Sequence, residues 1–126
     1  MTLRGTTDTN LRLLRAYAQR GWLVVYVLRR GYGQSDGPIP VAVTRCDGSP
    51  PTVQEFFDAD ANDLEAVLTH IGQREDADTD RIMALGVSGG GAAVVALGAR
   101  NISGLRIIIN LSGARPRAAT LRTTSD

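Results

Sequence analysis

The residue best suited to chemistry in this chain is Ser88, which lies in the glycine-rich segment Gly86–Gly91. The spacing Gly-x-Ser-x-Gly is typical of a nucleophilic serine on a tight turn between a strand and a helix. An apolar run, Arg81–Leu85, precedes the turn, and a stretch of small residues, Gly91–Arg100, follows it. The order strand, serine, helix therefore predicts a serine that attacks acyl carbonyls.

The residues around this serine are expected to shape the turn. A serine between a strand and a helix must adopt a strained backbone conformation to project its hydroxyl, and neighbouring side chains would collide in so tight a turn. We therefore expect Gly86 and Gly90 to be required as glycines. The backbone N–H of Gly89 would lie at the helix N-terminus, where the dipole favours a developing oxyanion.

Other motifs that could bind a cofactor or a metal fail on inspection. Neither glycine-rich segment completes a nucleotide-binding pattern, because Gly91 is followed by alanines and Gly31-Tyr32-Gly33 is followed by prolines rather than by a helix. The segment Asp76–Asp80 begins like a calcium loop, but the closing glutamate position falls on Val87. Cys46 is the single cysteine, so an internal disulfide and a cysteine-based structural zinc site are excluded. We expect no cofactor and no metal.

Composition narrows the partners and the location. The net charge is +1 at pH 7, which gives no reason to expect nucleic acid or an anionic membrane as a partner. The chain has no long apolar run of membrane-spanning length and no apolar signal region at its start. We expect a cytoplasmic protein.

The elements that must position the serine alternate along a single domain, residues 1–126, in the order α-β-α-β-α-β. Continuous apolar runs and helix caps, including the capping box Thr52–Glu55, set the boundaries. We expect a parallel sheet with helices on both faces and an irregular tail over residues 112–126. The expected helices are residues 10–20, 53–73 and 90–100, and the expected strands are Trp22–Leu28, Arg81–Val87 and Leu105–Leu111.

The string Arg29–Gly37 after an apolar strand, combined with the helix at 53–73 and with Gly86–Ala93, resembles the α/β-hydrolase superfamily. Within it the chain is similar to the dienelactone hydrolase-like and carboxylesterase-like group, over residues Arg12–Gly113. The resemblance implies a three-layer α/β-hydrolase-type parallel sheet, truncated here to about three strands and three helices. It also implies a serine hydrolase that acts on carboxylic esters or lactones. Ser88 would form the acyl-enzyme, and Gly89 would supply one oxyanion N–H.

The resemblance also implies that part of the site lies outside these residues. In the family the acid and the histidine follow the serine, whereas the one histidine here, His70, precedes Ser88 and is interpreted as a surface histidine near a helix end. The family's third strand, which lies between the strands expected at Trp22–Leu28 and Arg81–Val87, is also not among these residues. We therefore expect a central segment of a hydrolase, inactive in isolation.

The alternative is a truncated, non-catalytic hydrolase-like module that binds or interacts. An unpaired sheet edge would then favour self-association.

Overall fold

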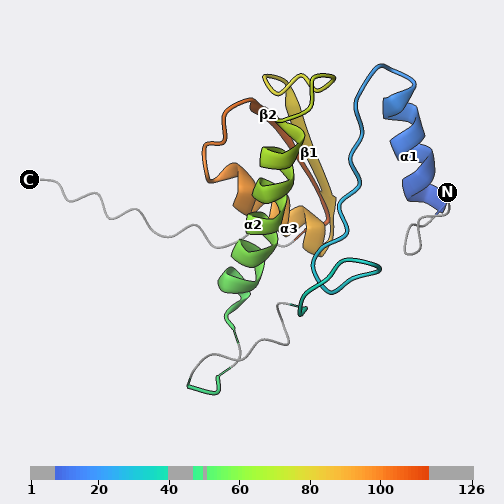
Figure 1. Ribbon diagram of the computed structural model, residues 1–126. Helices are drawn as coiled ribbons and strands as arrows, with labels where there is room; N and C mark the ends of the chain where they lie inside the picture. Colours follow the sequence, from blue (N-terminus) through green and yellow to red (C-terminus); the bar gives the residue numbers. More distant parts are fainter. Residues whose placement is uncertain (1–7, 40–46, 50, 114–126) are drawn as a thin grey trace, which may run out of the picture.

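The computed structural model describes residues 8–39, 47–49 and 51–113, which form a small α/β fold (Figure 1). Cys46 and most of the predicted tail lie outside the described residues. Three helices and two parallel strands are present in the described ranges, which confirms the prediction of an α/β-hydrolase-type parallel fold. In chain order they are α1 (Asp8–Ala18), α2 (Val53–Ile71), β1 (Ile82–Val87), α3 (Gly89–Gly98) and β2 (Leu105–Leu111).

Helix α2 begins at the predicted capping box. The Thr52 hydroxyl accepts from the Glu55 N–H at 3.2 Å, and the Glu55 carboxylate accepts from the Thr52 N–H at 2.7 Å. The apolar face that the sequence predicts for this helix points inward, with Phe57 and Ala61 buried and Leu64 packed against them. The cap and the apolar stripe together hold α2 against α3.

The two strands pair in parallel, with Val87 beside Leu111 and a register irregularity between Ile82 and Met83. Helix α3 contacts both strands, and its buried small residues, among them Ala92 and Ala96, allow a close approach. Because α2 packs on α3, both helices lie on the same face of the sheet. The core therefore sits between α2, α3 and this one face.

The predicted strand Trp22–Leu28 is wrong: the segment has no strand structure, and β1 pairs only with β2 among the described residues. No backbone hydrogen bond of the described residues involves Leu23–Val27. Its apolar composition suits a buried strand, but a strand also needs a neighbour that satisfies its N–H and C=O groups. The two apolar runs do not pair with each other, and no described strand takes the place of the third strand that the resemblance implies between them.

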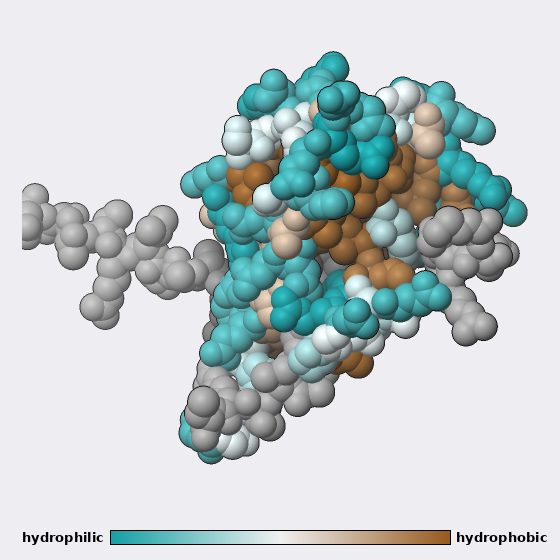
Figure 2. Space-filling model, in the orientation of Figure 1, coloured by the Kyte–Doolittle hydropathy of each residue, from teal (hydrophilic) through white to brown (hydrophobic). Residues whose placement is uncertain are grey.

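The second face of the sheet carries apolar side chains on both strands: Met83, Leu85, Val87, Ile107, Ile109 and Leu111. Within the described ranges no helix packs on this second face, since α1 contacts no other described helix or strand. Figure 2 shows hydrophobic side chains gathered between α2 and the segment that follows α1. Within the described ranges, no helix combines the length and hydrophobicity needed to cross a bilayer.

Candidate active site at the carboxyl end of the sheet

Ser88 stands between the end of β1 and the start of α3, and its backbone is strained. Its φ is 53° and its ψ is −121°, a conformation that residues with a Cβ rarely adopt. Its N–H donates to the carbonyl of Leu111 at 2.9 Å, and its carbonyl accepts from the N–H of Ala92 at 3.2 Å. The side chain is exposed and does not cap α3. The predicted strained turn is therefore confirmed, and β2 and α3 together hold it.

The glycines of the turn differ in what they permit. A Cβ on Gly86 would overlap the carbonyl oxygen of Gly90, so glycine is required at Gly86 as predicted. A Cβ on Gly90 would meet nothing within 4 Å, so the expectation that crowding requires glycine there is wrong. The second requirement falls on Gly91, where a Cβ would overlap the Asn110 side-chain oxygen. Only the packing of α3 on β2 decides this position.

Asn110 closes the turn that follows β2. Its side-chain oxygen accepts from the N–H of Gly113 at 2.7 Å, and its amide nitrogen donates to the Gly113 carbonyl at 3.3 Å. Between them Ser112 has a φ of 58°, close to that of Ser88. Two exposed serines with left-handed backbones therefore follow adjacent parallel strands at the same sheet edge.

Gly89, the residue expected to supply the oxyanion N–H, is the first residue of α3 and faces a guanidinium group. A Cβ on Gly89 would lie 3.5 Å from one terminal nitrogen of Arg29 and 3.9 Å from the other. The Arg29 guanidinium also lies 4.7 Å from the centre of the Tyr32 ring. The segment before the long loop therefore places a positive charge beside the turn.

Asp60 forms an ion pair with this arginine. Arg29 Nη1 donates to Asp60 Oδ2 at 2.7 Å, and the Asp60 side chain is completely buried. Its other oxygen, Oδ1, has no hydrogen-bond partner among the described residues. This pair was not predicted from the sequence. Adjacent arginines before the loop and acids three residues apart on α2 are the signal that could have indicated it.

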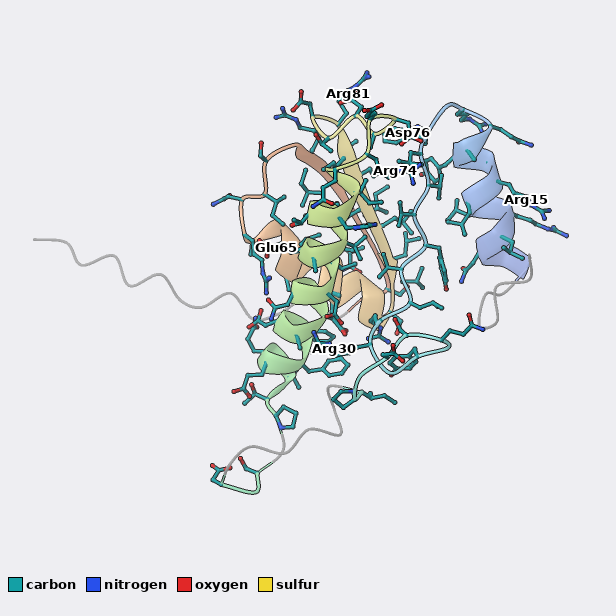
Figure 3. The ribbon with its side chains drawn as sticks, viewed as in Figure 1. Arg15, Arg30, Glu65, Arg74, Asp76 and Arg81 are labelled. Carbon is teal, nitrogen blue, oxygen red and sulfur yellow. The ribbon has the colours of Figure 1, made fainter. Side chains whose placement is uncertain are left out.

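A second bridge joins the same loop to the same helix. Arg30 donates to both carboxylate oxygens of Asp63, with Nε 3.0 Å from Oδ1 and 2.8 Å from Oδ2, and its Nη2 also contacts Oδ1. Figure 3 shows Arg30 near the half of α2 where the helix begins. The hydrogen bonds from Arg30 lower the pKa of Asp63, while partial burial opposes that shift. This bridge anchors the loop without contacting Ser88 or Gly89.

His70 lies at the opposite end of the sheet from Ser88. It is an exposed residue in the last turn of α2, ten residues beyond Asp60 and so about 15 Å further along the helix. The same end holds the acidic segment before β1, where Asp76 pairs with Arg74 and Asp78 pairs with Arg81 (Figure 3). His70 therefore cannot take a proton from Ser88 in this arrangement.

Neither a metal site nor a surface hollow adds to the site around Ser88 in the described residues. The described residues contain no group of three or more His, Cys, Asp or Glu side chains that could hold a metal ion. A shallow hollow between the end of α3 and β2 is lined by Gly98, Asn101, Ile102, Leu105, Arg106 and Ile108. Since α3 begins at Gly89 and ends at Gly98, this hollow lies away from Ser88.

Comparison with known proteins gives the family. The profile of the X-Pro dipeptidyl-peptidase (S15 family) matches residues 2–123, nearly the whole chain. No curated protein and no solved structure matches it significantly. This is a family of serine hydrolases with the α/β-hydrolase fold, which supports the superfamily expected from the sequence but not the dienelactone hydrolase-like group. A strained serine at a strand-to-helix turn agrees with that match, and the chain belongs to the X-Pro dipeptidyl-peptidase (S15) family.

Proposed function

We propose that Ser88 is the nucleophile of an acyl-transfer reaction. The supporting observation is the backbone of Ser88, with φ 53° and ψ −121°, held between β1 and α3 with the hydroxyl exposed. The serine oxygen attacks the carbonyl carbon while its proton passes to a base, and the tetrahedral intermediate then expels the leaving group, which takes up a proton, to give the acyl-enzyme. Water then releases the acid. The Gly89 N–H, at the N-terminus of α3, donates to the oxyanion of the tetrahedral intermediate.

The substrate we propose is a carboxylic ester or lactone, as the resemblance to carboxylesterases and dienelactone hydrolases implies. The family description names dipeptidyl peptidases that act on X-Pro peptides. Such substrates carry an ammonium group at the N-terminus of the acyl part. The charged group that lies against Gly89 is the guanidinium of Arg29, and a cation there disfavours an ammonium. This contact supports the ester over the X-Pro peptide for these residues.

We propose that the reaction of this chain alone is slow. A serine needs a base to accept its proton, and the one histidine in the sequence lies at the far end of α2. Acylation in isolation therefore relies on buffer or hydroxide as the base.

The test is covalent labelling followed by intact-protein mass spectrometry. A fluorophosphonate probe is expected to add one label per chain slowly, and Ser88→Ala is expected to abolish it. Ser112→Ala is the matched control, because Ser112 is also exposed after a strand and has a similar φ of 58°. Added imidazole is expected to accelerate labelling of the wild type by supplying the missing base.

Two results would contradict the proposal. One is labelling that persists unchanged in Ser88→Ala, and the other is labelling that Ser112→Ala removes instead. Labelling at the rate of a complete serine hydrolase, without imidazole, would contradict the proposed lack of a base.

A second candidate function is a non-catalytic module that self-associates, and the open sheet face favours it. Val87, Ile107 and Leu111 on this face are 53%, 48% and 44% exposed. A contiguous apolar face of this kind favours contact with another chain. Light scattering is expected to show dimers that Ile107→Lys disperses, and a monodisperse monomer would argue against this function.

A further inference from the structure

Arg29 is the charged side chain in contact with the turn that carries Ser88, and its surroundings hold it there. Its guanidinium is fixed from three sides, by the Asp60 carboxylate at 2.7 Å, by the Tyr32 ring at 4.7 Å and by the Phe56 ring at 6.0 Å. Gly89 also lies beside the guanidinium, where a built Cβ would be 3.5 Å from Nη1 and 3.9 Å from Nη2. Arg29 is thus a positioned cation rather than a freely moving surface group.

Arg29 and Arg30 use their hydrogen-bond donors differently. Arg30 engages both oxygens of Asp63 through Nε and Nη2, an arrangement that fills the fork of the guanidinium. Arg29 gives only Nη1 to Asp60, and its other donors have no partner among the described residues. If anchoring the loop were the only requirement, the Arg30 bridge already meets it. The unused edge of Arg29 remains available to an incoming group.

Asp60 explains how this edge keeps its orientation. A buried carboxylate needs a charged partner, because an unpaired ion in the protein interior is strongly unfavourable. Asp60 is completely buried, and its Oδ1 is without a partner in the described part of the chain, so Arg29 Nη1 is its one compensating contact. This requirement holds Arg29 close to Gly89 while the side chain stays 27% exposed. Solvent, and therefore a substrate, can reach it.

We propose that Arg29 determines specificity by binding a carboxylate on the acyl part of the substrate, with Asp60 as the residue that positions it. The inference rests on the proposed acylation of Ser88 and names its preferred substrates, half-esters of dicarboxylic acids. A guanidinium presents parallel N–H donors that match the two oxygens of a carboxylate. Since Gly89 follows Ser88 directly, a substrate carbonyl at the serine brings its acyl chain close to Arg29.

The test compares two acyl donors of equal chain length that differ in charge, the p-nitrophenyl half-ester of adipic acid and p-nitrophenyl hexanoate. Acylation of Ser88 is followed by intact mass, with the uncatalysed reaction subtracted. The wild type is expected to react faster with the anionic ester. Arg29→Gln is expected to lower the ratio of anionic to neutral rates about tenfold, the value of one charge-assisted contact.

Arg30→Gln is the matched control, because it removes an arginine–aspartate bridge between the same loop and the same helix without touching Gly89. Its ratio is expected to equal that of the wild type. Arg29→Lys, which keeps the charge and loses the fork, is expected to give an intermediate ratio, and it covers the case in which Arg29→Gln fails to fold. Equal ratios in wild type and Arg29→Gln, or an equal fall in Arg30→Gln, would overturn the inference.

A second measurement does not depend on reaction. Titration with sodium adipate is expected to shift the Gly89 amide resonance in the wild type and in Arg30→Gln, but not in Arg29→Gln. If no ester acylates Ser88 and these shifts still follow Arg29, the proposed function fails and the anion-binding role stands. If the wild type shows no shift, or Arg29→Gln shifts equally, the anion-binding role fails by itself.

Discussion

Two apolar runs, one before α2 in the sequence and one after it, have similar compositions but different structures. The run Ile82–Val87 forms β1, pairs with β2 along its length and is covered by α3. The run Trp22–Leu28 is non-regular, and its side chains at Trp22, Leu23 and Val25 are exposed. Both look like buried strands by composition. The difference lies in their neighbours and not in their own residues.

An apolar run supplies only one of the two partners that a strand needs. β1 is hydrogen-bonded at both ends to β2 and the residue before it. The Ile82 N–H donates to the Gly104 carbonyl at 2.8 Å, and the N–H of Ser88, directly after β1, donates to the Leu111 carbonyl at 2.9 Å. Trp22–Leu28 has no such partner in the described ranges. A strand thus depends on an edge to pair with, and a two-stranded sheet in turn depends on the helix that covers it.

The largest expected effect comes from removing a core side chain on the structured side. Leu97 is 1% exposed in α3, so Leu97→Ala is expected to lower the free energy of unfolding by about 2–5 kcal/mol. Leu23→Ala, in the run without strand structure, is expected to cost less than about 1 kcal/mol because Leu23 is 45% exposed. Urea unfolding followed by circular dichroism measures both. Equal losses would mean that the two regions are packed alike.

Hydrogen exchange tests the same contrast at the backbone. The amides of Ile82 and Ser88 donate to β2 and the residue before it, so we expect them to exchange at least about 100-fold more slowly than the amides of Val24 and Val27. The measurement is amide exchange followed by NMR. Comparable protection at Val24 would indicate that this run pairs with a strand in solution.

The smallest expected effect concerns pH and the bridge that anchors the loop to α2. Hydrogen bonds from Arg30 lower the folded-state pKa of Asp63, so the bridge stabilises the fold fully above the ordinary Asp value of about 3.9. This contribution is lost as the pH falls through the lower folded-state value. Asp63→Asn is expected to cost less than about 1 kcal/mol at pH 7, because Arg30 is 40% exposed.

The measurement for this bridge is urea unfolding of wild type and Asp63→Asn between pH 7 and pH 2. Their stabilities are expected to converge below about pH 4. If the difference in unfolding free energy between wild type and Asp63→Asn stayed constant down to pH 2, the contribution of Asp63 to stability would not depend on its negative charge.

Local patterns predicted most of the elements. The capping box at Thr52 marks the start of α2, and the predicted strand Leu105–Leu111 matches β2. Within the site, the strained backbone of Ser88 and the need for glycine at Gly86 follow from the motif and are confirmed. Each of these features depends on residues close together in the sequence, which explains why they could be predicted.

The features that the sequence did not predict depend on contacts between distant residues. Crowding falls on Gly91 rather than Gly90 because α3 packs against Asn110 of β2. The Arg29–Asp60 pair joins residues 31 positions apart, and only the docking of the loop on α2 brings them together. No local sequence pattern predicts which of several acidic residues on a helix will be buried.

By itself the sequence determined the position of Ser88, the strand-to-helix turn around it and the α/β class, because these are properties of short segments with a fixed order. The tertiary structure decided which apolar run becomes a strand, which face of the sheet is covered and which charge lies beside Gly89. Hydrogen bonds between strands, close packing and ion pairs need two partners in space, and a pattern in one segment specifies only one of them.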